Sequence, residues 1–257
     1  MTKTNIDDIK LVTFWHGGAL PRLHRECLKT WLKLDYSITI YSYEPLVEMF
    51  KGVQVRDASE ILPLNSASRL RNWAAVADII RLILLLVPNN VWVDTDLCLL
   101  RRIPSEKGFL LGYQRNGKTC NAIMRLWKEH HIADLVLTHF YEGSLGPWTH
   151  KKPRIKKWLS DFLGTDFNFK KLPNSHWGSH ALDYYVRENE LSRLLLPQKA
   201  FYPEETYSGA LFTDRPFEHI ICDNEIFGLH FFFKSADFEN PQKGSFYEWL
   251  IQHNAIS

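Results

Sequence analysis

The chain has 257 residues, of which 45% are hydrophobic and 23% are charged, and its formal net charge is +2. This composition is that of an ordinary globular protein, so it excludes a disordered chain, and the near-neutral charge argues against nucleic acid as a partner. The length fits one large domain, and we expect a single domain over residues 1–257.

The first ninety residues are expected to alternate between strands and helices. A turn is expected at His16-Gly17-Gly18. The predicted strands are 10–14, 37–41 and 53–55, and the predicted helices are 21–34 and 45–50. Such alternation predicts an α/β fold with a mostly parallel, Rossmann-like central sheet flanked by helices.

A long apolar helix is predicted over residues 69–87, ended by Pro88. Asn89-Asn90 provides the next turn, because Asn tolerates left-handed backbone conformations, and residues 91–93 form a strand. Further strands are expected at 109–113 and 121–124, and further helices at 126–141 and 152–163. The C-terminal third is rich in aromatic residues and is expected to be irregular, with a last strand at 226–231.

The sequence favours a cytoplasmic location. Residues 1–8 lack the apolar core of a signal peptide, and the most apolar segment, 79–87, is too short to span a bilayer. The four cysteines are widely separated, which fits a reducing compartment. The basic run 150–157 is interpreted as the solvated face of a helix, with peripheral contact at the inner face of a membrane as the alternative.

The motif Asp94-Thr95-Asp96 follows the strand predicted at 91–93. In a strand, Asp94 and Asp96 would point to the same face and could share a cation. Two carboxylates suit an octahedral divalent ion that takes its other ligands from water and a substrate diphosphate. A D-x-D in a loop without a metal is the alternative, but the carboxyl end of a strand in an open α/β sheet is where ligands bind.

Asp78 and Arg81 are the only polar side chains between Val76 and Val87, and their spacing places them on one helix face. An internal salt bridge that neutralises itself is one explanation for ionised groups in so apolar a helix. Because the acidic motif lies close by, we favour a shared pocket. There Asp78 would accept hydrogen bonds from sugar hydroxyls, and Arg81 would donate to hydroxyl or phosphate oxygens.

The run Ala77-Asp78-Ile79-Ile80-Arg81-Leu82, followed by Val91-Trp92-Val93 and Asp94-Thr95-Asp96, resembles the D-x-D glycosyltransferases of the GT-A fold. The likeness is nearest to glycosyltransferase family 32, the small sugar transferases that include α-1,4-galactosyltransferases and yeast-type initiating mannosyltransferases. In that family an (S/A)-D-x-x-R helix precedes a Y-x-D-x-D strand, and the segment 14–18 resembles its opening I-W-x-G loop. The resemblance covers residues 11–104. The chain departs from it at Pro88-Asn89-Asn90, where the family has Gly-Gly, and at Ala77, where Ser is commoner, so the donor's identity stays open.

The resemblance implies a role for individual residues. Donor binding would fall to Trp15, Asp78, Arg81, Asp94, Thr95 and Asp96, and a Mn²⁺ or Mg²⁺ ion would be held by Asp94, Asp96 and His230. Catalytic roles would fall to Asp96, Arg81 and Asp183, the last as an acidic candidate in the region expected to meet the acceptor. Core packing is the alternative for Trp15, and a structural role among phenylalanines is the alternative for His230.

The implied activity is metal-dependent transfer of a hexose or N-acetylhexosamine from a UDP-linked nucleotide sugar to a glycan or glycolipid acceptor. Retention of anomeric configuration and a place in surface polysaccharide assembly of the bacterial type are part of this expectation. Residues 10–125 would bind the nucleotide sugar and residues 126–257 the acceptor. The alternatives are a phosphohydrolase of the haloacid-dehalogenase kind, whose D-x-D normally follows the first strand, and a non-catalytic sugar-binding module.

Overall fold

The computed structural model describes residues 9–47, 49–104, 108–126, 131–165, 167–232 and 237–255. The expectation that the N-terminus lacks a signal peptide concerns residues 1–8, which lie outside the described residues. Within the described ranges, the helices are all too short or too polar to cross a lipid bilayer.

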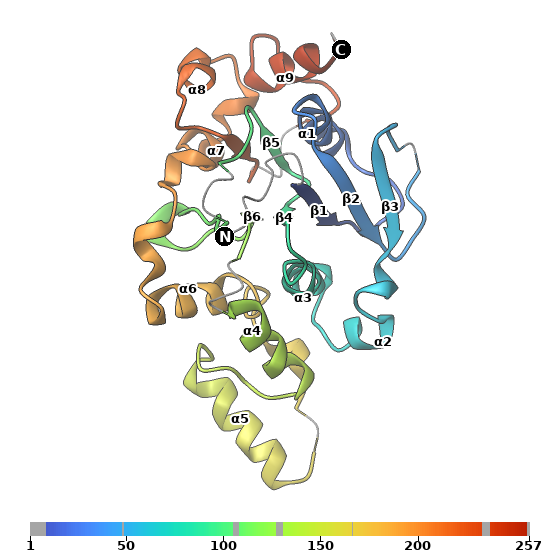
Figure 1. The fold of residues 1–257 in the computed structure, drawn as a ribbon, viewed down its shortest axis with the longest axis vertical. Coiled ribbons are helices and arrows are strands. Elements are labelled where there is room, and N and C mark those ends of the chain that lie inside the picture. Colours follow the sequence, from blue (N-terminus) through green and yellow to red (C-terminus); the bar gives the residue numbers. More distant parts are fainter. Residues whose placement is uncertain are drawn as a thin grey trace.

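A mostly parallel five-stranded sheet forms the centre of the molecule (Figure 1). Its strands, in spatial order, are β3 (Val53–Asp57), β2 (Ser37–Ser42), β1 (Lys10–Phe14), β4 (Asn90–Val93) and β6 (Ile123–Met124). The pairs β3–β2, β2–β1 and β1–β4 are parallel, and β6 is antiparallel to β4. The expected α/β class with a mostly parallel sheet flanked by helices is therefore confirmed, and the arrangement is consistent with a Rossmann-like fold.

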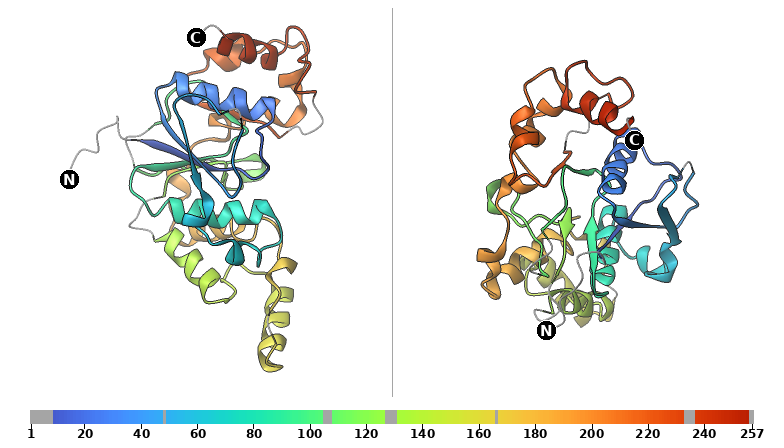
Figure 2. Two further views of the ribbon diagram at one scale, coloured as in Figure 1. Left: turned by 90° about the vertical axis from the view of Figure 1, so that its right-hand side faces the viewer. Right: turned by 45° about the horizontal axis from the view of Figure 1, so that its top comes forward.

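Alternation along the strands directs neighbouring side chains into different cores. Leu11 packs in a cluster with Trp31 of α1 (Arg22–Lys33), whereas Val12 packs in a cluster with Ile79 of α3 (Trp73–Leu84). Both strand residues have no exposed surface. Figure 2 shows the result, with α1 on one face of the sheet and α3 on the other. Helices on both faces explain why β1 and β2 are buried along almost their whole length.

The order of the strands reverses between β1 and β4. From β1 the chain moves outward through β2 and β3, and α3 then carries it back to β4 on the other side of β1. The carboxyl ends of β1 and β4 thus lie side by side at the point where ligands bind in open α/β sheets. The sequence segments that follow these two ends begin with Trp15 and Asp94.

A second, two-stranded sheet brings the C-terminal region to the same place. β5 (Leu97–Leu99) pairs antiparallel with β7 (Gly228–His230), and Leu97 lies opposite His230. In α1, the Trp31 indole N–H donates to the β5 backbone, and the Thr30 hydroxyl accepts a hydrogen bond from it. Helix α9 (Phe246–Ala255) packs against α1 (Figure 1). The last predicted strand is therefore present, in the shorter range of β7.

The C-terminal third is more helical than expected. It contains α6 (Ser179–Glu188), α7 (Glu205–Ser208), α8 (Glu218–Cys222) and α9, joined by loops and short 3₁₀ turns. Upstream of it lie α4 (Ile132–Tyr141) and α5 (Lys151–Phe162). The prediction for α5 is confirmed to within one residue at each end. The helix predicted from residue 126 begins only at Ile132, and residues 127–130 lie outside the described residues.

Two further expectations, for the segments 45–50 and 109–113, were wrong in detail. The described residues of the segment 45–50 are not helical, since the Val47 N–H donates to the Gly18 carbonyl rather than to its own segment. The segment 109–113 makes only isolated bridges, in which Leu110 pairs with Arg125 and Gly112 with Leu196.

The helix predicted over 69–87 is shorter, running from Trp73 to Leu84 after the separate short helix α2 (Leu64–Ala67). It begins where the Asn72 side chain accepts a hydrogen bond from the Ala75 N–H, a capping contact that stabilises a helix start. Beyond its end, Asn89 has a φ of +68°, which confirms the predicted left-handed turn.

Candidate functional site

The two acids of the D-x-D motif are brought together by a turn and not by a strand. β4 ends at Val93 and β5 begins at Leu97, and the Leu97 N–H donates to the Asp94 carbonyl at 3.0 Å to close the turn between them. The expectation that strand alternation aligns Asp94 and Asp96 is therefore wrong. The tight reversal nevertheless leaves both carboxylates near one point.

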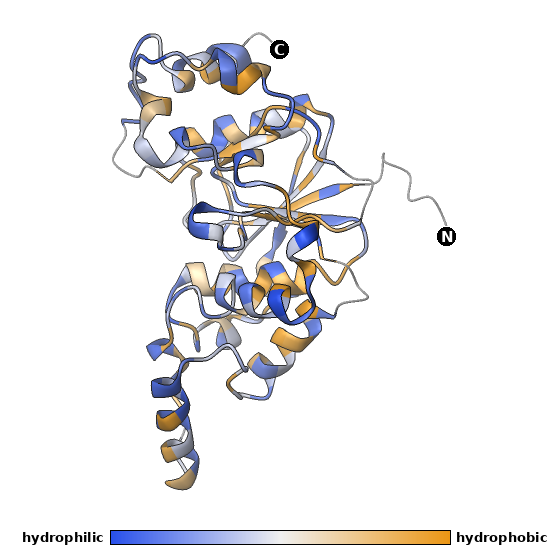
Figure 3. Ribbon diagram, turned by 90° about the vertical axis from the view of Figure 1, so that its left-hand side faces the viewer, coloured by the Kyte–Doolittle hydropathy of each residue, from blue (hydrophilic) through white to orange (hydrophobic). Residues whose placement is uncertain are grey.

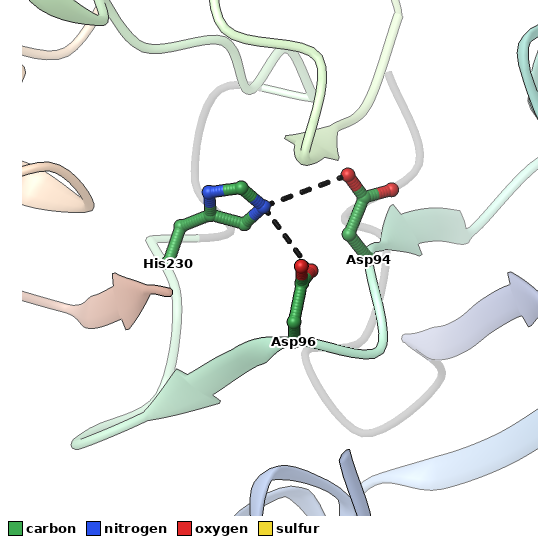
Figure 4. Close-up of side chains that lie close together, drawn as sticks. All are labelled: Asp94, Asp96 and His230. Carbon is green, nitrogen blue, oxygen red and sulfur yellow. Dashed lines mark ion pairs between the residues drawn. The ribbon is translucent and has the colours of Figure 1, made fainter. Parts of the chain in front are cut away.

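His230 from β7 completes this acidic pair (Figure 4). Its Nε2 lies 3.1 Å from Asp96 Oδ1 and 3.8 Å from Asp94 Oδ2. One ligand atom from each of the three residues lies within 4.8 Å of the others, so the cluster could hold a metal ion. The Asp94 and Asp96 side chains are 25% and 31% exposed and the His230 side chain 10%, which leaves an open side for a ligand.

Arg81 ties this cluster to Asp78. Its Nη1 donates to Asp78 Oδ1 at 2.8 Å, and its Nη2 donates to Asp94 Oδ1 at 2.9 Å. The guanidinium also lies 4.6 Å from the centre of the Trp92 ring, and the indole N–H of Trp92 donates to the same Asp94 oxygen at 2.6 Å. The salt bridge between Asp78 and Arg81 thus exists, as the simpler alternative required. It is not an isolated pair, however, because the second Nη of the guanidinium donates to Asp94, the first acid of the D-x-D motif.

The pKa is raised for two of the three acids and lowered for the third. Burial raises the pKa of Asp78 to about 7, although Arg81 acts in the opposite direction. Burial also raises the pKa of Asp94, again against the influence of Arg81. Burial acts on Asp96 in the same sense, but the charge of His230 and its hydrogen bond outweigh it and lower the pKa of this acid. Desolvation disfavours the charged His230, yet the charge of Asp96 and the hydrogen bond to it prevail and raise the pKa of the imidazole.

A pocket of about 500 Å³ opens over this network, within the range of roughly 300–1,000 Å³ usual for ligand sites. All six residues predicted to bind the donor line it: Trp15, Asp78, Arg81, Asp94, Thr95 and Asp96. His230 does not belong to the residues that line the pocket, but its ring lies close to two of them, Asp94 and Asp96. The tertiary structure therefore brings together residues that follow β1 or lie on α3, in the β4–β5 turn and on β7.

A glycine and an amide fix the carboxylate of Asp78. Asn121 Nδ2 donates to Asp78 Oδ1 at 3.1 Å. Gly178, at the start of α6, lies so close that a Cβ atom there would stand 2.4 Å from the same oxygen. Only a residue without a side chain allows α6 to begin against this acid.

Several lining residues were not anticipated from the sequence. His24 of α1 contacts Thr95 Oγ1 through Nδ1 at 2.8 Å, and its ring lies 4.7 Å from that of Trp15. Burial lowers the pKa of His24, while Asp96 acts to raise it. His16 and Trp73 stack with ring centres 3.6 Å apart. The available signals were weak, namely a histidine two residues into a helix and a tryptophan five residues before Asp78.

Asp183 is not brought into the pocket. It lies on α6, and its Oδ1 accepts a hydrogen bond from the Thr119 N–H at 2.7 Å. It does not belong to the residues that line the pocket. In this conformation the carboxylate holds the 112–120 loop against α6.

Comparison with known proteins adds no family assignment. No protein-family model matches the chain, and no curated protein matches it.

Proposed function

We propose that this protein is a metal-dependent glycosyltransferase that takes its sugar from a nucleotide-sugar donor, with UDP as the expected nucleotide. The observation that carries the proposal is that Asp94 and Asp96 lie close to His230 and also line one pocket with the ion pair of Asp78 and Arg81. This pocket opens at the reversal of strand order, where α/β proteins bind nucleotides.

The residues present fit a divalent cation of the Mn²⁺ or Mg²⁺ type. Carboxylate oxygens are ligands that both ions accept, and an added imidazole nitrogen favours Mn²⁺ of the two. The charges agree with this, since three carboxylates line the pocket and Arg81 is the one guanidinium among the described lining residues. A divalent ion would balance that excess negative charge. Binding through His230 Nε2 would release the proton that this nitrogen shares with Asp96.

The transfer breaks the bond between the anomeric carbon and the diphosphate oxygen, which keeps the electron pair. A bond forms from that carbon to an acceptor oxygen, whose proton passes to the departing diphosphate. A bound cation supplies charge neutralisation to the departing diphosphate. Asp78 accepts hydrogen bonds from sugar hydroxyls at the edge of the pocket. Arg81 keeps Asp78 and Asp94 in register through its two Nη atoms, so that sugar and diphosphate are held in one geometry.

Three aromatic side chains offer flat ring surfaces to the pocket. Trp15, His16 and Trp73 all line it, and Trp73 is 39% exposed. Such surfaces bind flat, partly polar groups, and the base of a nucleotide is one. Asn174, Ser175 and Ser179 also line the pocket and offer polar side chains to the acceptor, a glycan or glycolipid.

The decisive test combines turnover with ligand-dependent melting. Asp96→Asn is expected to reduce Mn²⁺-dependent hydrolysis or transfer from a panel of nucleotide sugars at least about a hundredfold, because a catalytic metal contributes several kcal/mol of charge stabilisation. The wild-type melting temperature should rise with UDP plus Mn²⁺ but not with UDP plus a chelator, as binding linkage requires.

The matched control is Asp134→Asn, an exposed acid on α4 with a side chain 54% exposed. It should leave turnover and the UDP–Mn²⁺ shift unchanged. Full turnover in Asp96→Asn, or equal stabilisation with and without chelator, would remove the metal assignment. Metal-dependent hydrolysis of a phosphomonoester without any nucleotide-sugar turnover would support the phosphohydrolase alternative instead.

A further inference from the structure

Helix α5 projects from the body of the molecule (Figure 3). Large apolar side chains along its length are exposed. Among the residues of this helix, none is buried. The exposed apolar residues are Ile155 at 58%, Trp158 at 64%, Leu159 at 44%, Phe162 at 76% and, just beyond the helix, Leu163 at 68%. Single exposed apolar residues are common, but a contiguous group on one element marks an interaction surface.

These side chains share one face of the helix. Their spacing of three and four residues forms a single stripe, and the rings of Trp158 and Phe162 stack with centres 5.8 Å apart. The half-covered residues Pro153, Lys157 and Ser160 lie on the opposite side. Lys157 there lines a cavity together with Arg69 and Tyr141 of the body. The apolar stripe therefore faces away from the protein.

Basic side chains flank the stripe. The helix carries Lys151, Lys152, Arg154, Lys156 and Lys157, and Asp161 is its only acid. That acid already pairs with Lys157 on the body side. The outward-facing surface is thus an apolar centre between positive edges.

We propose that α5 docks on an anionic lipid surface, with Ile155, Trp158 and Phe162 entering the interface and the flanking lysines facing the headgroups. An apolar face with Trp and Phe beside Lys and Arg is the composition of helices that lie in the plane of a membrane. At 1.5 Å per residue the helix is about 18 Å long, which suits lying on a bilayer and not crossing it. A second copy of the chain fits less well, because pairing two such helices would bring like charges together.

This inference does not depend on the proposed activity. It rests on the exposed apolar stripe of α5 and the charges beside it, and none of the residues of α5 lines the pocket. It also reverses the interpretation favoured by the sequence, in which the basic run was an ordinary solvated face. The exposed fractions of Trp158 and Phe162 decide between the two.

Vesicle flotation tests the proposal directly. The full chain should float with phosphatidylcholine vesicles that contain phosphatidylglycerol, and much less with phosphatidylcholine alone or at high salt. Trp158→Ser with Phe162→Ser should abolish flotation. Lys152→Gln with Lys156→Gln should weaken it by about fivefold per lysine, the usual effect of one basic residue near an anionic surface.

Matched controls keep the result specific. Leu64→Ser with Val87→Ser removes apolar residues that are 55% and 53% exposed elsewhere, and it should not alter flotation. Lys51→Gln with Lys243→Gln is the charge control. The Trp158/Phe162 variant should keep its melting temperature, since both rings are exposed. Asp96→Asn should float like the wild type whatever its turnover, which separates this proposal from the enzymatic one.

Three results would overturn the proposal. The first is equal flotation with and without the anionic lipid, and the second is unchanged flotation of the Trp158/Phe162 variant. The third is a concentration-dependent dimer in sedimentation equilibrium that this variant dissolves, without any binding to vesicles. That outcome would assign the stripe to a second copy of the chain.

Discussion

Arg81 links two carboxylates that come from different elements. Asp78 is one turn away on α3, and Asp94 follows β4, so the two Nη atoms of one guanidinium connect a helix face to a strand end. The side chain is 6% exposed and lies over the Trp92 ring. Two charge-assisted hydrogen bonds in this fork geometry need a planar group, which Lys lacks.

Arg81→Lys is therefore expected to destabilise the protein by about 1.5–3 kcal/mol, roughly one lost hydrogen bond to a charged group, and to reduce turnover further. Urea unfolding and kcat measurements on the same preparation separate the two effects. Arg56→Lys, at an exposed ion pair with Glu60, is the control and should change neither. A variant as active and as stable as the wild type would mean that the fork is not needed.

Helix α6 sets the position of Asp78 through its first residues. The helix starts directly after Gly178, whose Cα lies against the Asp78 carboxylate, while Asn121 fixes the same carboxylate from the β6 side. The donor-side acid is thus held between three elements that are distant in the sequence. Displacing any one of them should move it.

Gly178→Ala tests this arrangement. The added Cβ would stand 2.4 Å from a buried, hydrogen-bonded oxygen, so Asp78 or α6 must shift, at a cost of about 1–3 kcal/mol. We expect a lower melting temperature together with a loss of turnover. Gly112→Ala is the matched control, because its Cβ would make only ordinary contacts, at 3.5 Å to the Phe201 ring and at 3.8 and 4.0 Å to Leu196. Equal behaviour of the two variants would count against a steric role for Gly178.

At the scale of the whole molecule, the packing beneath α4 and α6 buries a histidine in a neutral form. His176 is 2% exposed and lies beside Trp177 and Trp148, with ring centres 4.7 and 5.7 Å away. Burial lowers its pKa to about 3, and the charges of His180, His150 and His139 act in the same direction. As the pH falls, the His176 imidazole is therefore protonated in the unfolded chain before it is protonated in the folded one, and this favours unfolding.

The pH dependence of stability follows from this shift. The unfolded imidazole titrates near 6.5 and the folded one near 3, so the contribution of His176 is fully present above pH 6.5 and declines as the pH falls toward 3. Between pH 7.5 and pH 5 it should reduce the free energy of unfolding by about 2 kcal/mol. Denaturant unfolding at several pH values should show a flatter profile for His176→Gln.

His131→Asn is the control for that series. The His131 side chain is 64% exposed, and Asn tolerates its φ of +48°. Its profile should run parallel to that of the wild type. If His176→Gln also runs parallel, the buried imidazole does not account for acid sensitivity.

The sequence alone determined the elements with a strong local signal. The strands at 10–14, 37–41 and 91–93, the Asn89 turn and the extent of helix α5 were predictable because periodicity and turn preference act over a few residues. The placement of Asp78 and Arg81 on one helix face followed from their spacing. The same local rules misplaced the segment 45–50, whose backbone bonds to Gly18, and the strand geometry of the D-x-D, which is a turn.

Only the tertiary structure decided what surrounds those residues. The β5–β7 pairing places His230 beside acids that precede it by more than 130 residues, and α6 presents Gly178 to Asp78 while turning Asp183 toward the Thr119 backbone. Whether α5 is a solvated face or an exposed apolar stripe was also fixed by packing, since the body covers only one of its sides. Contacts between distant segments depend on how elements pack across the sheet, and no local periodicity carries that information.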